Sequence, residues 1–486
     1  MHFKNTTLAT LAIFLMVTSC TKTELTSAYS NPNGAGSTAR SAAAGTSSRG
    51  SANGNYLVIC KTPAVSKKVL DQVQSIGTVT RSLAEFGVVL AKSTDPDFAS
   101  TISQVNEVES VVPDLEYDML VNTWQSDKAH RFSASAVAPQ TSHLSLPGLT
   151  GSNSIAPLQW NLKAVNAHAA FASGYKGAGA VVAVLDGGFY MDNPDLAPNI
   201  LVNKATSFIP GESAQYKYPT GISHGTHVAG IIAAADNDYG IVGIAPAAKL
   251  MLVKVLSDDG WATLGTILSG IYYAANNGAD IISMSLGGFF PRNDHTFTPD
   301  FLALNRAFQY AKQKGVVSIA AVGNSSLDFN GQGQLTVLPA SSVNVIAISA
   351  TGPLGWGTDQ NTSLFPPAVY TNFGTSLIDF AAPGGNTKLP QNNTPVTIGG
   401  LTLPVWIFDE VVSDGKTGEF VFMSGTSMAA PAAAGVAALI VGKHGGNISP
   451  VSVENKMKAS AVDMGAPGND DYYGRGHVNA GNAVQQ

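Results

Sequence analysis

Six short apolar runs lie in the second half of the chain, separated by longer segments with a different pattern. The runs are VVAVLD, KLMLVKVL, DIISMSL, VVSIAAVG, VNVIAISA and LIDFAAPG, between residues 181 and 384. Runs this continuous suit strands with both faces buried. The segments LGTILSGIYYAANNG and FLALNRAFQYAKQKG have helical periodicity instead. Strands alternating with helices predict an α/β fold, a three-layer, doubly wound and mostly parallel sheet within residues 156–486.

Residues 56–120 have a separate pattern that predicts a small α+β domain. We expect strands in YLVIC, FGVVLAKS and SVVPDLEYDML, and polar helices near residues 66–76 and 97–106. A polar, Ser- and Pro-containing stretch at residues 121–155 follows and is expected to be a linker.

The N-terminal residues predict export. Residues 1–20 contain Lys4, an apolar run and then Thr-Ser-Cys20, and the run is too short to span a bilayer. The ending resembles a bacterial lipoprotein signal, in which Cys20 carries the lipid; a soluble export signal is the alternative. Residues 21–55 are dominated by Ser, Gly, Ala, Asn and Thr and predict a flexible tether. We therefore expect a protein anchored in the periplasm or at the cell surface, or otherwise secreted.

Composition removes one class of function and constrains the cysteines. The 486 residues carry a net charge of -6 without any lysine or arginine run, which excludes a nucleic-acid footprint. Cys60 is the only cysteine besides Cys20. If Cys20 is acylated no disulfide can form, so Cys60 is expected to be a small buried hydrophobe.

Three polar residues have the chemistry of acyl transfer. Asp186 ends VVAVLD, His224 lies in SHGTHVAG and Ser427 lies in SGTSMAAPAAAG. A nucleophilic serine needs a base and a carboxylate that orients the base. Each residue alone has a simpler explanation: a turn aspartate, a zinc pair in HGTH, or a helix N-cap in Gly-Thr-Ser. Their joint presence favours catalysis.

Eight segments together resemble the subtilisin family (subtilases) of serine proteases: VAVLDGG, HGTHVAGIIAA, GIAPAAKL, SMSLGG, AAVGN, FAAPGG, SGTSMAAPAAAG and YGRGHVNA. The resemblance implies that Asp186 orients His224, that His224 is the general acid and base, and that Ser427 is the nucleophile. It also implies that Asn324 and the Ser427 N–H form the oxyanion hole.

The resemblance further implies how substrate binds. An extended polypeptide is expected to add as a strand beside one segment and to place a side chain against another. These substrate-binding residues are Ser285, Leu286 and Gly287, and Ala321, Val322 and Gly323. Small residues in the second segment indicate an apolar pocket of moderate width. We expect polypeptide substrates, no cofactor for the chemistry, and a monomer.

A structural calcium site is also implied by the resemblance. Its oxygen ligands are expected from Asp195, Ala235, Asn237, Tyr239 and Ile241. The family adds a glutamine near the start of the domain, where the register here falls on Ala156, with Gln159 three residues later. An ordinary Asx-rich turn is the alternative.

Residues 56–120 resemble the inhibitor-like prosegment of these proteases in length, element order and position. The resemblance implies that this domain assists folding, blocks the cleft with its last strand, and is removed by cleavage within residues 121–155. An adaptor domain carried on the tether is the alternative.

The chain departs from the family pattern in two places. Gly187 follows Asp186 where Ser or Thr is usual, which predicts a raised pKa or looser geometry for the carboxylate. It leaves open a catalytically impaired, protease-like binding protein. Residues 386–420 resemble an inserted hairpin pair on the surface. A serine esterase of the α/β-hydrolase type is excluded, since it needs Gly-x-Ser-x-Gly with the histidine last.

Overall fold

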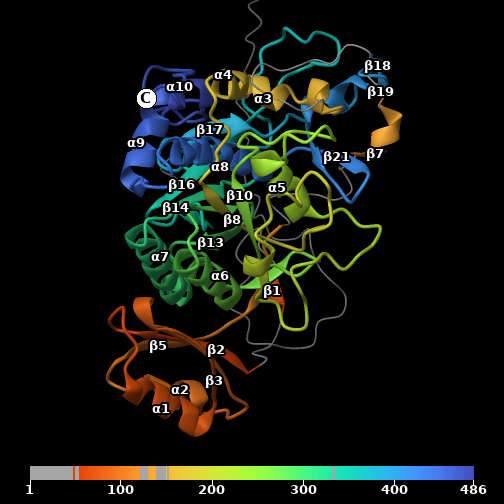
Figure 1. Ribbon diagram of the computed structural model, residues 1–486. Helices are drawn as coiled ribbons and strands as arrows, with labels where there is room; N and C mark the ends of the chain where they lie inside the picture. The colour runs from red at the N-terminus through yellow and green to blue at the C-terminus, as the bar shows by residue number, and fades with distance from the viewer. Residues whose placement is uncertain (1–47, 50–53, 121–129, 138–148, 150–152, 331–333) are drawn as a thin grey trace, which may run out of the picture. The chain divides into compact units, whose positions relative to one another are not determined.

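The computed structural model describes residues 48–49, 54–120, 130–137, 149, 153–330 and 334–486 (Figure 1). The expected export signal, Cys20 and most of the tether lie outside these residues.

A seven-stranded sheet forms the centre of residues 156–486. Its strand order is β17-β16-β14-β12-β8-β10-β9, and every neighbouring pair is parallel. All six apolar runs supply strands to it, which confirms the predicted α/β fold. The strands are β8 (Val181–Asp186), β9 (Thr206–Ser207), β10 (Lys249–Lys254), β12 (Ile281–Met284), β14 (Val317–Ala321), β16 (Val345–Thr351) and β17 (Phe380–Pro383).

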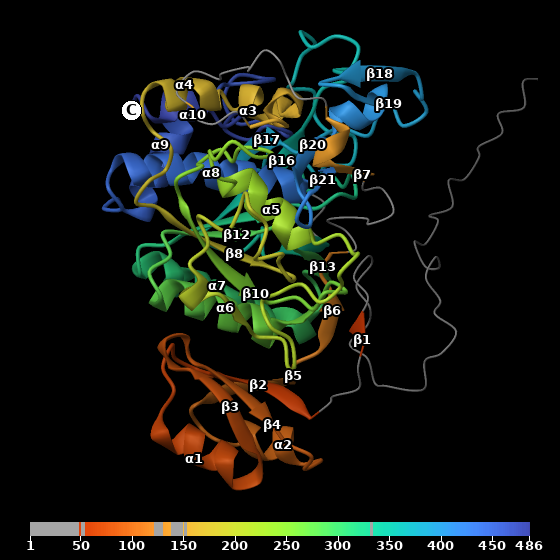
Figure 2. The same cartoon turned by 45° about the vertical axis from the view of Figure 1, so that its right-hand side comes forward.

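Helices cover both faces of this sheet, as the two views in Figures 1 and 2 show. Val182 and Val184 of β8 belong to the core under α5 (His224–Ala233) and α8 (Thr426–Lys443). Ala183 and Leu185 belong to the opposite core, under α6 (Leu264–Asn276) and α7 (Thr298–Gln313). Alternate residues therefore serve two cores, which explains why the runs are apolar at every position. The remaining helices are α3 (Trp160–Ala164), α4 (Ala167–Ala172), α9 (Pro450–Ser460) and α10 (Ala480–Ala483).

Helix α8 is the core helix of the first layer. Among the described residues it is the one helix with the length and hydropathy of a membrane span, but 89% of that window is buried inside the protein. Its apolar character is thus explained by packing.

The N-terminal domain is the α+β unit predicted for residues 56–120. Its antiparallel sheet has the order β3-β4-β2-β5, and α1 and α2 pack on it around Val58, Val69 and Phe98. Cys60 is 2% exposed in this core, as expected, and burial raises the pKa of its thiol. The elements are β2 (Asn55–Cys60), α1 (Lys67–Ile76), β3 (Thr78–Leu83), β4 (Val88–Lys92), α2 (Phe98–Ser103) and β5 (Val108–Pro113).

Short strands join this domain to residues 156–486. β6 (Glu116–Asp118) pairs antiparallel with β11 (Trp261–Thr263) and with β1 (Ser48–Arg49). Beyond it, in the stretch expected to be a linker, β7 (His130–Ser133) pairs with β21 (Glu419–Met423).

The stretch expected to be a surface insertion holds two hairpins. β18 (Pro395–Ile398) pairs with β19 (Leu401–Pro404), and Gln391 to Pro395 before them are exposed. β20 (Val411–Asp414) pairs with β21, but all four of its residues are buried. The surface assignment is therefore wrong for β20: this strand is buried, and its Ser413 Oγ finds a buried partner by donating to the His227 carbonyl at 2.7 Å. One further antiparallel pair joins β13 (Gly288–Pro291) to β15 (Leu335–Leu338).

Candidate active site

Asp186 and His224 form a buried pair at the carboxyl end of the central sheet. Asp186 is the last residue of β8 and is 0% exposed; His224 is the first residue of α5. The imidazole Nδ1 lies 2.9 Å from Asp186 Oδ1 and 3.0 Å from Oδ2. A carboxylate on Nδ1 leaves Nε2 as the nitrogen that can exchange a proton with a hydroxyl.

The turn after Asp186 holds its carboxylate without a hydroxyl at position 187. The Gly187 N–H donates to Asp186 Oδ1 at 2.7 Å, and the Val255 N–H donates to the Asp186 carbonyl at 2.9 Å. The Gly187 N–H thus binds the carboxylate, and Val255 holds the main chain of Asp186, without the usual Ser or Thr side chain.

Ser427 is the second residue of α8 and is anchored at its carbonyl. Ser285 Oγ donates to the Ser427 C=O at 2.7 Å, and Ser427 Oγ donates to the Ser285 C=O at 3.4 Å. Pro431, four residues on, has no N–H for the Ser427 carbonyl. The Ser285 hydroxyl therefore takes the place of one helical hydrogen bond.

Asn324 is oriented by the residue before the serine. The N–H and hydroxyl of Thr426 both donate to Asn324 Oδ1, each at 2.9 Å. The Gly323 N–H donates in turn to Thr426 Oγ1 at 3.0 Å. The amide oxygen is thereby held at the start of α8, with the NH₂ group at the other end of the amide.

The sheet topology brings these residues to one edge. Asp186 ends β8, Ser285 follows β12 and Asn324 follows β14, and these three strands are adjacent and parallel. Ser427 is bound to Ser285, and α8 packs against α5, which begins with His224. The residues predicted from four distant segments thus meet at the carboxyl edge, where α/β sheets place their ligands.

The predicted substrate segments flank this edge. Leu286, Ala321 and Val322 are all 0% exposed, so these three side chains belong to the core. Gly323 has φ 92°, in the left-handed region that favours glycine. The Gly287 N–H donates to the Met119 carbonyl at 3.0 Å, and the Met119 N–H donates to the Gly260 carbonyl at 3.0 Å. The segment that contains Met119 thus lies between Gly260 and Gly287 and is hydrogen-bonded to both through its main chain.

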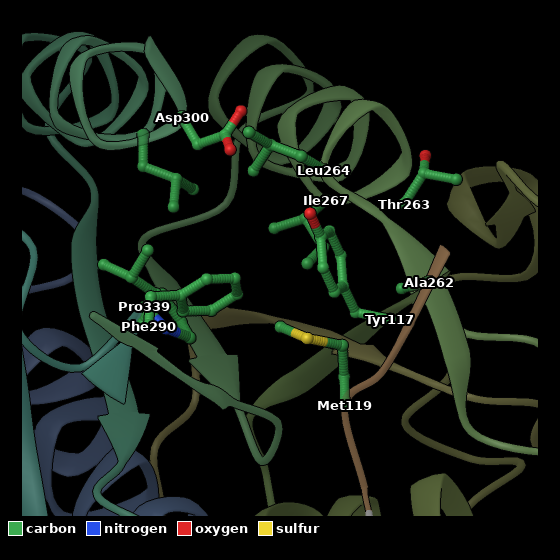
Figure 3. A pocket seen from close by; sticks show the side chains of 11 residues that line it. Tyr117, Met119, Ala262, Thr263, Leu264, Ile267, Phe290, Asp300 and Pro339 are labelled. Atoms are coloured by element: carbon green, nitrogen blue, oxygen red, sulfur yellow. The ribbon is translucent and has the colours of Figure 1, made fainter. Parts of the chain in front are cut away.

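Two side chains of that segment enter an apolar pocket that the sequence did not predict. Figure 3 shows Tyr117 and Met119 pointing toward Leu264, Ile267 and Phe290. The space left between them is about 20 Å³, close to the volume for one water molecule. Leu264 and Ile267 belong to a segment that the sequence predicts only as a helix, and no local motif marks their place in this pocket.

The residues predicted to hold calcium lie together. Asp195 is 0% exposed, and its Oδ2 accepts the Ile241 N–H at 3.0 Å. The Ala235 N–H donates to the Asp195 carbonyl at 2.7 Å, and Asn237 Oδ1 accepts the Tyr239 N–H at 3.2 Å. Asp195 Oδ1 receives no hydrogen bond from the described residues. A buried carboxylate oxygen without a donor, beside several carbonyls, fits a hard cation.

Gln159, the glutamine expected near this site, bonds the backbone of Val242 instead. Gln159 bonds both the carbonyl and the N–H of Val242, at 2.8 and 2.9 Å, and Ala156 lies in a 3-10 turn. Asn153 is 7% exposed, its Nδ2 donates to Asp236 Oδ1 at 3.3 Å, and its Oδ1 receives no hydrogen bond from the described residues. Asn153 is thus the better placed amide, and the sequence comparison missed it.

A second buried carboxyl lies beside Asp195. Burial, and then the charge of Asp414, raise the pKa of Asp195; burial also raises the pKa of Asp414. Two neighbouring carboxylates that are buried away from water repel each other, so a proton or a cation must compensate their charge. In the described part of the chain no cluster of three metal-binding acidic, His or Cys side chains occurs, so a cation here would depend on carbonyl and amide oxygens.

Comparisons with known proteins agree with this geometry. A family model described as "Subtilase family" matches residues 177–476. M-protease of Shouchella clausii is 35% identical over 321 residues, which cover 66% of this chain and 68% of that protein. Subtilisin Savinase of Lederbergia lenta is 34% identical over 321 residues, covering 66% of this chain and 96% of that protein.

A solved structure extends the similarity in fold. The epidermin leader peptide processing serine protease of Staphylococcus aureus has a TM-score of 0.67 at 22% identity, covering 89% of this chain and 97% of that one. The matched family region contains Asp186, His224, Asn324 and Ser427. The chain therefore belongs to the subtilase family and is a serine endopeptidase.

Proposed function

We propose that this enzyme cleaves peptide bonds with Ser427 as nucleophile, His224 as general acid and base, and Asp186 as the orienting carboxylate. The observation that carries the proposal is the hydrogen bonding between the Asp186 carboxylate and His224 Nδ1, at the edge where Ser427 lies. His224 Nε2 takes the Ser427 proton as Oγ attacks the scissile carbonyl, and then gives it to the leaving amine. Water attacks the acyl-enzyme by the same route in reverse.

The oxyanion of the tetrahedral intermediate is proposed to bind to Asn324 and to the N–H of Ser427. Thr426 holds the amide oxygen of Asn324, which supports a fixed position for its donor nitrogen. Ser427 also lies in the first turn of α8, where the helix dipole favours negative charge. Loss of one oxyanion donor typically costs about a hundredfold to a thousandfold in kcat.

Substrate is proposed to bind as an extended strand between Gly260 and Ser285 to Gly287, with a side chain placed near Ala321 to Gly323. The main-chain hydrogen bonds of Met119 support this, since they use groups that every peptide possesses. The apolar pocket around Leu264 and Ile267 favours an apolar side chain a few residues before the cleaved bond.

The enzyme is proposed to be made as a precursor whose residues 56–120 are an inhibitory prosegment. Three contacts to the catalytic part support this. Asp114 Oδ1 accepts the Gly265 N–H at the start of α6, at 3.0 Å. Arg306 Nη1 donates to the Cys60 carbonyl at 2.7 Å, and Tyr272 OH donates to Glu85 Oε1 at 2.9 Å. Cleavage within residues 121–155 would release this domain.

Calcium and export complete the proposal. Asp195 Oδ1, the Asn237 and Asn153 side chains, and carbonyls of Ala235, Tyr239 and Ile241 would hold a calcium ion, which would tie the loop to the domain and take no part in the chemistry.

The N-terminal signal supports export, with a lipid on Cys20 as the anchor. Replacement of Cys20 by Ala should release the protein from the membrane fraction.

A fluorophosphonate probe tests the catalytic assignment. The wild-type enzyme should be labelled on Ser427, and Ser427→Ala should abolish labelling and leave the precursor uncut. Labelling that persists in the variant would contradict the assignment. A wild-type protein that neither labels nor matures would instead favour the protease-like binding protein.

A further inference from the structure

A buried lysine lies directly behind the proposed catalytic pair. Lys254 ends β10, which pairs with β8, and it stands opposite Asp186 in the register of the two strands. Its side chain is 0% exposed. Nζ lies 2.5 Å from Asp258 Oδ1 and 2.7 Å from Glu212 Oε2. A buried ammonium is costly unless it is paired, so these two carboxylates explain how Lys254 is tolerated, but not why it is there.

Asp258 links this lysine to the turn that follows Asp186. Its Oδ1 accepts the Gly188 N–H at 3.1 Å, and its Oδ2 accepts the Lys217 N–H at 3.0 Å. A Cβ at Gly188 would lie 2.3 Å from Asp258 Oδ1 and 3.1 Å from Lys254 Nζ. That Cβ would also lie 2.7 Å from the Tyr216 Cα, so the close approach of this backbone and of the ion pair together leaves room only for glycine at position 188.

The carbonyl of Gly188 is bound by the residue that precedes His224. Ser223 Oγ donates to the Gly188 carbonyl at 2.6 Å and accepts the Thr226 N–H at 3.0 Å, as the N-cap of α5. His224 is the next residue. Gly188 is therefore fixed through its N–H by Asp258 and through its carbonyl by the residue that positions His224.

We propose that Lys254 and Asp258 are positioning residues, which hold Gly188 and so fix Asp186 relative to His224. The inference rests on the proposed function of that pair. Two consecutive glycines after Asp186 give the turn unusual backbone freedom, and the Asp258 carboxylate removes it from outside the turn. Displacement of about 1 Å in such a pair can cost about a hundredfold in rate, so a remote anchor matters to the chemistry.

Glu212 provides a matched control within the same ion cluster. It contacts Lys254 as Asp258 does, and its other oxygen accepts Lys217 Nζ at 3.3 Å. Of these two carboxylates, Asp258 accepts the Gly188 N–H within the described part of the chain. Burial alone would raise the pKa of Glu212, but Lys254 and Lys217 outweigh it and leave that pKa lowered. Substitution of Glu212 thus disturbs the ion pairing and spares the anchor.

The test compares Asp258→Ala, Asp258→Asn and Glu212→Gln in the full chain. We expect Asp258→Ala to lower kcat, per probe-titrated Ser427, about tenfold to a hundredfold, with KM changed less than about twofold. Glu212→Gln should keep kcat within about twofold at a similar loss of Tm. Asp258→Asn should recover part of the kcat, because its amide oxygen can still accept the Gly188 N–H.

Two outcomes would overturn the positioning role. One is a folded Asp258→Ala variant that labels and turns over at the wild-type rate. The other is an equal loss of kcat in Asp258→Ala and Glu212→Gln, which would assign the cluster to stability alone. If Asp258→Ala does not fold, the ratio of kcat between Asp258→Asn and Glu212→Gln decides in the same way. Wild-type protein without labelling at Ser427 would instead remove the proposed function itself.

Discussion

The hydroxyl of Ser285 donates a hydrogen bond of 2.7 Å to the main-chain carbonyl of Ser427. Pro431 cannot supply the helical N–H that this buried carbonyl lacks. The end of β12 and the start of α8 are therefore joined at this carbonyl by a side-chain hydrogen bond that replaces the helical one Pro431 cannot make.

A double-mutant cycle tests that relationship. Ser285→Ala should cost about 1–3 kcal/mol of stability, since the Ser427 carbonyl is left buried without a donor. Pro431→Ala restores a helical N–H to the same carbonyl, so Ser285→Ala should cost less in the Pro431→Ala background. Urea unfolding of the four proteins, each carrying Ser427→Ala to prevent self-digestion, measures the coupling. Strictly additive losses would show that the carbonyl does not depend on Ser285.

Removal of calcium should lower the melting temperature. A chelator leaves the Asp195 and Asp414 carboxyls to face each other without a cation between them. We expect a fall of several degrees, reversed by added calcium, and little effect of the chelator on Asp195→Asn. Melting curves with and without chelator provide the measurement, and an unchanged midpoint in the wild type would remove the site.

His477 should make stability depend on pH below neutrality. Burial lowers the pKa of its imidazole from 6.5 to about 4, while Nε2 lies 3.1 Å from Thr351 Oγ1. Between these two pKa values, His477 is protonated in the unfolded chain and neutral in the folded protein. The contribution is fully present above the unfolded pKa near 6.5 and is lost as the pH falls toward about 4.

Replacement of His477 by Gln should flatten this dependence. Between pH 6.5 and 4, the slope of the unfolding free energy should decrease by up to about 1.4 kcal/mol per pH unit. His227, whose pKa burial lowers to about 3, remains in the variant and keeps part of the slope. Equal slopes in the two proteins would mean that His477 titrates normally in the fold.

The mature enzyme should retain β7. Phe132 of this strand is 9% exposed and packs against Phe420 and Phe422, and Arg131 Nη1 donates to the Thr220 carbonyl at 2.6 Å. Cleavage before His130 keeps this packing, whereas cleavage after it would strip a strand from β21. N-terminal sequencing and intact mass of the matured protein should place the new terminus upstream of His130. A terminus beyond Val137 would contradict this.

The fold was predictable where its pattern has a single explanation. The run VVAVLD is apolar at every position because its alternate residues face two different cores. Strand β3, with the sequence TVTRSL, was missed: it is an edge strand, mostly exposed, and its polar residues carry no hydrophobic signal. The burial of β20 was missed because its partners are backbone groups of α5, far away in sequence.

The site was predictable only as far as its motifs reach. Asp186, His224 and Ser427 each lie in a recognisable segment. Lys254 has the sequence context of an ordinary strand end, and Asp258 that of a turn aspartate, so their meeting at Gly188 depends on tertiary structure. That Gln159 is not available to the proposed calcium site likewise depends on tertiary structure, because its amide already bonds the Val242 backbone.

Helix α8 carries Ser427 on its first turn, and from Thr426 to Val441 all of its residues are buried. Ser427 therefore belongs to a buried helix and not to a loop that can open by itself. Amide hydrogens in the interior of α8, whose N–H groups are bonded within the helix, should exchange with solvent only through global unfolding. On heating, the position of Ser427 and the packing of the core should therefore be lost in the same unfolding transition.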